Sequence, residues 1–344
     1  MYCYTAKEDG EVVDINEEIK MVTIKYKSGK IYTFTYDDIY SSSSDVAVTQ
    51  KQVLKVKKGQ KFKKNDVLRY NPEMFIEDFE NPNGVCLKHG LTGTVALIDT
   101  STTFEDSNVV SKEFGQRLAI QPIVTKTLDI PISSIIHEFK YVGDNVLSSE
   151  PLLVFEDEQT VDFTNASIDA TSLAYLEKLN RKSPKAKTTG KIVKINCYYH
   201  KSLSEMNPSV ANVVRKVIKQ DNQRASYSKG TDSSIEFIES SILPKDSKYK
   251  GINLSEDNVI FQFYIQENIE QGIGDKILLD TALKTVTSTV MDIAPKGEKS
   301  GRNIDVMYAA VGVSNRIVTS PFVMGVAEAV LEKTEENIID MYFN

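Results

Sequence analysis

Three basic residues near the C-terminus are spaced so that they could bind one anion. Lys276 ends a Gly-Asp-Lys turn, and Lys284 begins a strand-like run rich in β-branched residues. Arg316 closes a Gly-Val-Ser-Asn-Arg segment that follows a short apolar strand at 304–308. A rigid sheet could direct these three cationic side chains at one anion. From composition alone, the alternative is that the two lysines are solvated turn residues.

Two adjacent carboxylates, Glu105 and Asp106, follow an apolar strand at 91–98. Neighbouring residues on an extended loop point to opposite sides, so they do not fit a glycosidase pair, whose carboxyls face each other across roughly 5 to 10 Å. A place beside a metal-bound triphosphate fits better, with one carboxylate reaching Mg²⁺ or its waters and the other fixing a basic neighbour. An ordinary acidic turn is the alternative.

The elements that must position these residues are mostly strands, so we expect a mainly β protein with a few helices (α+β). The patterns predict a meander at 11–36, a lysine-rich hairpin at 55–64, further strands from 118 to 155, and a strand at 259–265.

Three helices are predicted. An amphipathic helix is expected at 168–181, and a second begins at Asn207 and Pro208 and is followed by a polar loop at 220–230. The last helix starts at Ser320, and four of its residues are expected to face a core. These are Val323, Ala327, Val330 and Leu331.

Composition limits the classes of function. The chain has 344 residues and a formal net charge of −7, so nucleic acid would have to bind through local patches or partner chains. Three scattered cysteines indicate a reducing compartment. The pairs Cys86/His89 and Cys197/His200 are too far apart in sequence to predict a zinc site. With no long apolar run and no secretory segment, we expect no membrane contact and a cytosolic or packaged protein.

The order of these motifs resembles one family. Gly-Asp-Lys276, then Lys284, then an Ile-Asp strand and Gly-Val-x-x-Arg316 is similar to the catalytic side of the β subunit of multisubunit DNA-directed RNA polymerases. Upstream, the apolar strand and the Phe-Glu105-Asp106-Ser loop match in the same order. The family's Gly-rich segment after Gly-Asp-Lys is replaced here by 280–283, and its arginine near the triphosphate has no counterpart in 41–44. The chain thus resembles the C-terminal half of β, as a distant member of the family.

The resemblance implies a double-psi β-barrel with an inserted flap-like module. Residues 1–118 would hold the N-terminal β segment and the first part of the barrel, 119–257 the flap-like insertion, 258–320 the second part of the barrel, and 321–344 a C-terminal helix. The 168–181 helix would then correspond to the flap tip that docks a promoter-specificity factor.

The resemblance also implies roles for the site residues. Lys276 and Lys284 would hold the phosphates of the RNA 3′ end, Arg316 the triphosphate, and Glu105 and Asp106 the surroundings of the second Mg²⁺. The family's Asp-x-Asp-Gly-Asp loop, which carries the main metal ligands, is absent from the sequence. The chain would therefore act only as a subunit of a nucleotidyltransferase, with Mg²⁺ held mainly by a partner.

The implied partners are an N-terminal β-like subunit, β′-like subunits, template DNA, nascent RNA and nucleoside triphosphates. Split β subunits of this kind resemble those of giant bacteriophages, which would place the protein in the host cytoplasm or also in the virion. Two other classes stay open. One is a β-rich virion or structural interaction protein without a catalytic role, and the other is a stand-alone hydrolase that uses Glu105 and Asp106.

Overall fold

The computed structural model describes residues 3–42, 47–88, 90–157, 181–234, 248–249, 252–253, 255–279, 283–298, 300–315 and 319–342. These residues are mainly β with a few helices, as the sequence predicted. They divide into two compact units, of which unit 1 comprises Met1–His89 and Gln121–Glu267, and unit 2 comprises Gly90–Ile120 and Asn268–Asn344. The unit boundaries differ from the four segments expected from sequence, whose assignment as barrel and flap stays a prediction. The expected 168–181 helix lies almost wholly outside the described residues.

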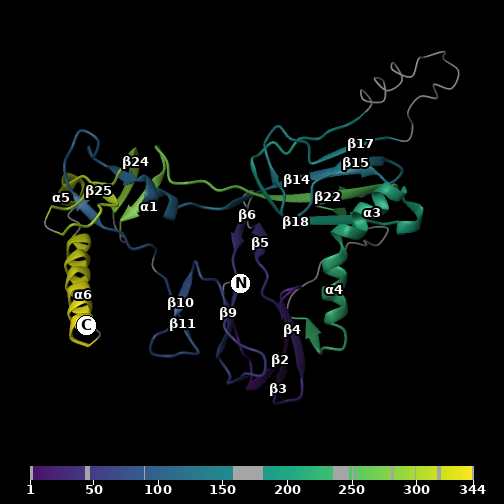
Figure 1. Cartoon of the computed structure of the whole chain (residues 1–344), viewed down its shortest axis with the longest axis horizontal. Coiled ribbons are helices and arrows are strands. Elements are labelled where there is room, and N and C mark those ends of the chain that lie inside the picture. The colour runs from purple at the N-terminus through teal and green to yellow at the C-terminus, as the bar shows by residue number, and fades with distance from the viewer. Residues whose placement is uncertain are drawn as a thin grey trace, which may run out of the picture. The chain divides into compact units, whose positions relative to one another are not determined.

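Unit 1 is built around a six-stranded sheet of order β16-β18-β22-β14-β6-β5 (Figure 1). Its strands are β16 (Asn145–Val146), β18 (Gly190–Tyr199), β22 (Asn258–Gln266), β14 (Pro122–Pro131), β6 (Ala47–Gln50) and β5 (Ile39–Ser42). Tyr40 on β5 lies 6.1 Å from Tyr264 on β22, ring centre to ring centre, although β14 and β6 separate these strands in the sheet. The sheet is therefore curled into a half-barrel.

One face of this sheet is covered by α3 (Pro208–Val217) and by the hairpin β15 (Ile135–Phe139) and β17 (Leu153–Glu156). Asn207 caps α3 by accepting a hydrogen bond from the Ser209 N–H, and Val210 and Val214 are fully buried against the sheet. The predicted helix start is thus confirmed. The predicted loop at 220–230 is wrong, because α4 (Lys219–Tyr227) follows α3 directly.

The predicted meander is confirmed as β2 (Gly10–Asn16), β3 (Met21–Tyr26) and β4 (Ile31–Thr35), which lie in a five-stranded sheet with two short strands. These short strands are β8 (Lys61–Phe62) and β19 (Ser233–Ser234). The remaining strands of unit 1 form a three-stranded sheet and two hairpins. They are β1 (Cys3–Thr5), β7 (Val53–Leu54), β9 (Val67–Tyr70), β10 (Phe75–Glu77), β11 (Val85–Leu87), β20 (Lys248–Tyr249) and β21 (Ile252–Asn253).

Unit 2 is a mixed five-stranded sheet of order β12-β25-β13-β24-β23. Its strands are β12 (Val95–Leu97), β25 (Val306–Tyr308), β13 (Ser107–Ser111), β24 (Leu283–Met291) and β23 (Lys276–Leu279). The expected strand at 91–98 is shorter than predicted. The helices are α1 (Lys112–Arg117), α5 (Ala310–Asn315) and α6 (Ser320–Tyr342).

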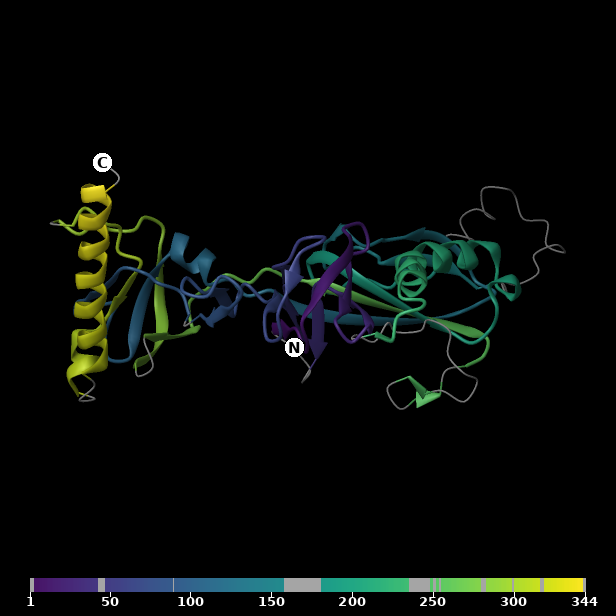
Figure 2. The ribbon, with the colours of Figure 1, turned by 90° about the horizontal axis from the view of Figure 1, so that it is seen from below.

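Helix α6 begins at the predicted residue, but the expectation that it faces a core is wrong (Figure 2). The side chains of Val323, Val330 and Leu331 are 65%, 60% and 69% exposed, and the helix has no buried residue. Its described polar link to the rest of the unit runs from Arg302 to Glu332 and Glu336. No described helix is both long enough and apolar enough to cross a membrane.

Candidate functional site

The Gly-Asp-Lys turn leads directly into the hairpin of β23 and β24. Gly274 has a φ of +92°, which favours glycine, and Asp275 closes the turn by accepting a hydrogen bond from the Gly272 N–H at 2.9 Å. Backbone bonds of 2.8 Å join Gly274 and Asp275 to Thr287 on β24. The backbone that precedes Lys276 is therefore fixed to the sheet.

The strand register places Lys276 and Lys284 on the same face of the sheet. Lys276 is paired with Val286, and Lys284 is paired with Leu278. Residues opposite each other on paired strands share a face of the sheet, and so does every second residue along one strand. The two lysines are therefore diagonal neighbours on adjacent strands, with their Cα atoms roughly 7–8 Å apart. Both are exposed, and no described residue forms an ion pair with either. Two of the three predicted cations are thus brought together.

The opposite face of the same strands is buried and polar. Asn108 on β13 donates to the Thr285 hydroxyl at 2.7 Å and accepts from the Thr287 hydroxyl at 3.0 Å. All three residues are at most 2% exposed. Because buried polar groups without partners are costly, this network fixes the register of β13 against β24, and with it the face on which the lysines lie.

The loop that carries Glu105 and Asp106 enters the sheet at β13, next to β24. The carbonyl of Asp106 accepts a hydrogen bond of 2.8 Å from the Val286 N–H. Val286 lies between Ser107 on β13 and Lys276 on β23, so the backbones of Ser107 and Lys276 are about 10 Å apart, two strand spacings. The carboxylate pair and the lysine pair therefore lie at one part of one sheet.

The loop is held in an unusual conformation. Glu105 has a φ of +52°, the left-handed region, and among the described residues of unit 2 it is the one non-glycine residue with positive φ. Hydroxyl groups fix the loop on both sides, since Thr103 donates to the Ile98 carbonyl and Ser107 to the Phe104 carbonyl, both at 2.6 Å. Backbone conformations of this kind cost energy and persist where the surroundings enforce them, often at functional sites. Sequence reasoning overlooked these hydroxyl contacts.

Arg316 lies outside the described residues, so its predicted position beside the lysines stays a prediction. Helix α5, which ends at Asn315, does reach the carboxylate loop. A Cβ atom at Gly312 would lie 3.1 Å from the Glu105 carbonyl oxygen, so the helix closely approaches the loop there. The Gly-Val-Ser-Asn segment before Arg316 forms the end of this helix.

The carboxylates fit an auxiliary role toward a metal. Within the part of the chain that the structure describes, no three histidine, cysteine or acidic side chains are grouped so that they could hold a metal ion. Glu105 and Asp106 are both exposed, and Mg²⁺ is often bound by one or two carboxylates together with phosphate oxygens. A role for these two carboxylates beside a partner-held Mg²⁺ therefore stays a prediction.

The cysteine pairs have separate environments. Cys197 is 2% exposed on β18, and this burial raises the pKa of its thiol. Cys86 is exposed on β11, and its neighbour His89 lies outside the described residues.

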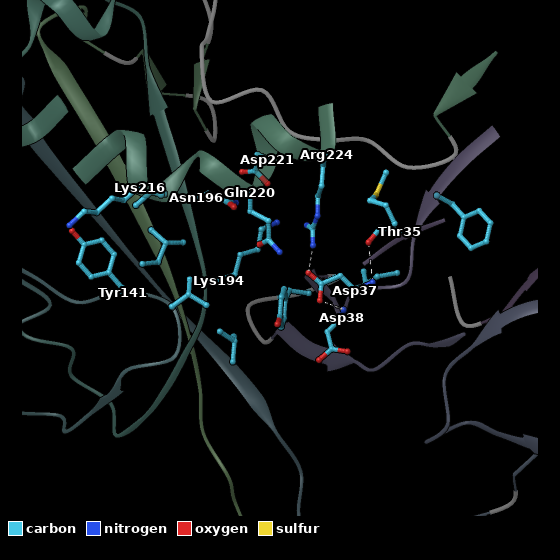
Figure 3. A pocket seen from close by; sticks show the side chains of 18 residues that line it. Thr35, Asp37, Asp38, Tyr141, Lys194, Asn196, Lys216, Gln220, Asp221 and Arg224 are labelled. Carbon is cyan, nitrogen blue, oxygen red and sulfur yellow. Dashed lines mark hydrogen bonds and ion pairs between the residues drawn. The ribbon is translucent and has the colours of Figure 1, made fainter. Parts of the chain in front are cut away.

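Unit 1 contains a pocket of about 570 Å³ that the sequence did not indicate (Figure 3). Its lining includes residues of β5, β18, α3 and α4 and the segment before β5. Arg224 on α4 donates to Asp37 at 2.6 Å, and Lys20 donates to the other oxygen of Asp37 at 3.0 Å. Burial alone would raise the pKa of Asp37, but these two hydrogen bonds outweigh it and hold the pKa below its usual range.

Comparison with known proteins gave no relative. No protein-family model matches the chain, and no curated protein matches it.

Proposed function

We propose that the chain is the C-terminal part of a β-like subunit of a multisubunit DNA-dependent RNA polymerase. In this proposal the sheet of unit 2 belongs to a double-psi β-barrel that supplies one side of a nucleotidyl-transfer site. A β′-like partner with an Asp-x-Asp-Gly-Asp loop supplies the other side, and an N-terminal β-like subunit completes β. The protein would work in the host cytoplasm of a bacteriophage infection, or also in the virion.

One observation carries this proposal. Lys276 and Lys284 share an exposed face of the sheet, without described ion pairs, beside the strand that begins after Glu105 and Asp106. The resemblance that the motifs carry requires the same five residues to converge, and four of the five are on the adjoining strands β23 and β24 or on the loop that leads into the neighbouring strand β13. Two lysines on one face of a hairpin, without an ion pair to any described residue, are suited to binding successive phosphates of an RNA chain.

The proposed roles follow from this geometry. Lys276 and Lys284 would hold the phosphates at the RNA 3′ end, and Arg316 would bind the incoming triphosphate. Glu105 and Asp106 would accept hydrogen bonds from the waters or basic groups around the second metal. When bound, Mg²⁺ supplies charge neutralisation at the triphosphate and activates the attacking hydroxyl. The chain's own residues position phosphates and do not carry out the chemistry alone.

The exposed apolar surface of unit 2 also supports an assembled subunit. Phe104 is 72% exposed beside the carboxylates, and Leu278, which pairs with Lys284, is 57% exposed on β23. Helix α6 adds further exposed apolar side chains, Val323, Val330 and Leu331 among them. A stand-alone hydrolase would not need such exposed apolar surface.

The test is purification of the tagged chain from its native source, followed by an assay for template-dependent RNA synthesis. We expect a chain with an Asp-x-Asp-Gly-Asp loop to co-purify. Lys276→Ala and Lys284→Ala should assemble normally but lower the rate of synthesis by about 100-fold each, the usual effect of removing an oriented charge-stabilising donor. Lys112→Ala, at an exposed site on α1 of the same unit, is the matched control. A chain that elutes alone, or lysine variants with full activity, would contradict the proposal.

A further inference from the structure

The pocket of unit 1 lies between the two edges of the open half-barrel. Its lining includes four consecutive residues at one edge, 37–40, and four consecutive residues of β18, 193–196. Neighbouring residues of a strand point to opposite faces of the sheet, so a cavity on one face contacts every second side chain. A lining of four consecutive residues therefore indicates a cavity that runs along the edge of the strand. The curled sheet brings its outermost strand β5 and the strand β18 to the same pocket (Figure 3).

Both edges offer backbone hydrogen-bonding groups. β16 pairs only with Gly190 and Lys191 of β18, and the turn at Gly143 and Asp144 extends the pairing to Ile192. From Val193 onward, β22 is the one strand among the described residues that pairs with β18. Likewise β5 pairs with β6 alone within the described chain. Such edges present alternate N–H and C=O groups to whatever lies beside them, and an added strand satisfies them.

Lys216 lies at one end of the pocket, and Lys194 on β18 lies nearer its middle (Figure 3). Lys216 lies over the ring of Tyr141, with its nitrogen 5.2 Å from the ring centre, and Lys194 lies over the ring of Tyr264 at 5.8 Å. Neither lysine forms an ion pair with a described carboxylate. The rings hold the two ammonium groups at the pocket wall without neutralising them.

The other end of the pocket is acidic. Asp37 is already paired there with Arg224 and Lys20, and Asp38 lies beside it (Figure 3). Asp221 also lines the pocket. The difference in charge between the two ends gives the pocket a direction.

We propose that this pocket binds an extended acidic peptide segment of a partner protein, which adds a strand along β18 and places acidic side chains beside Lys194 and Lys216. The strand edges account for an extended backbone, and the lysines account for its charge. A volume of about 570 Å³ is too small for a helix with its side chains but accommodates a few extended residues. The site is separate in sequence and in unit from the proposed polymerase residues and does not depend on them.

The first experiment selects from a displayed library of random nine-residue peptides on the full chain. The double variant Lys194→Glu/Lys216→Glu serves for counter-selection. The control is Lys191→Glu/Lys219→Glu, which makes the same charge change at exposed positions outside the pocket. We expect enriched peptides to carry Asp or Glu and to bind the pocket variant about tenfold more weakly, with the control variant unchanged. No enrichment, or enriched peptides that bind all three proteins equally, would overturn the proposal.

The second experiment tests the strand. An enriched peptide is synthesised with N-methyl groups on alternate backbone nitrogens, in the two possible phases. If the peptide adds a strand, one of the two N-methylated peptides should bind about tenfold or more weakly, because its methyl groups remove several backbone hydrogen bonds to β18. The other peptide, whose methyl groups face away from β18, should retain binding. Equal affinity for both phases and the parent peptide would show that no strand is added and would overturn the proposal.

Discussion

The two units differ in how much of their apolar surface they bury by themselves. Unit 1 covers the core face of its curled sheet with α3 and a hairpin, and fully buries Phe261, Phe263 and Ile265 on β22. Unit 2 has the smallest of the three core clusters, and its longest helix has no buried residue. The difference shows that the sheet of unit 1 buries its own apolar face, whereas unit 2 leaves its longest helix exposed within the described residues.

The largest expected effect tests the buried apolar face of unit 1. Phe261→Ala should lower the free energy of unfolding of unit 1 by about 3–5 kcal/mol, because a fully buried ring leaves a cavity. Leu278→Ala, at a half-exposed position in unit 2, is the control and should change stability little. Urea unfolding followed by circular dichroism measures both. A large effect of Leu278→Ala in the isolated chain would remove the contrast between the units.

The next effect concerns the polar side of the sheet in unit 2. Asn108→Ala should destabilise unit 2 by about 1–3 kcal/mol, because the Thr285 and Thr287 hydroxyls lose a buried partner. Lys284→Ala, on the exposed face of the same sheet, should stay within about 0.5 kcal/mol of the wild type. Hydrogen exchange of the β24 amides would report the difference. Equal exchange in both variants would contradict a register fixed by this network.

A smaller effect, in unit 1, depends on pH. The pKa of Asp37 is held below its usual range, so its pairing stabilises the fold above the unfolded pKa of about 3.9 and is lost as pH falls through the lower folded value. Arg224→Ala should cost about 1–2 kcal/mol at pH 7, and this cost should shrink as pH falls below about 4. Arg215→Ala, exposed on α3, is the control. A cost that does not vary with pH would contradict an ionic origin.

The smallest expected effect on stability comes from substitutions on α6, and they test the contrast between the two units most sharply. Val330→Ser and Leu331→Ser on α6 should change the stability of the isolated chain by less than about 0.5 kcal/mol, because neither side chain is buried. The same substitutions should reduce recovery of partner chains in the purification from the native source. Strong destabilisation of the isolated chain would mean that α6 packs against the rest of unit 2.

Local sequence signals predicted local structure well. Asn207 and Pro208 marked the start of α3, and the glycine turn at 274–276 marked the chain just before β23, since both depend on residues close in sequence. Helix α4 was missed because it has no apolar stripe. Contacts distant in sequence support it, from Arg224 to Asp37 and from Tyr227 to Asp14.

The candidate site was also predictable only in part, because local patterns do not show contacts between residues distant in sequence. The spacing of Lys276 and Lys284 indicated two cations, and the β23–β24 register places them on one face. The opposite face is buried by contacts of Thr285 and Thr287 with Asn108, almost 180 residues away in sequence. The apolar pattern of α6 predicted a helix with buried residues, yet a pattern cannot show whether the surface that covers it belongs to the same chain. The pocket between β5 and β18 arises from the curl of a sheet, which no local pattern encodes.

The most direct measurement of the central claim is a cross-link from RNA to the lysine pair. An RNA whose 3′-terminal ribose has been oxidised to a dialdehyde is added to the purified assembly on template DNA, reduced with borohydride and mapped by mass spectrometry. We predict attachment at Lys276 and Lys284, lost in the corresponding alanine variants and unaffected by Lys112→Ala. Attachment only at the lysine-rich hairpin of unit 1, or none to this chain in an assembly that makes RNA, would contradict the account.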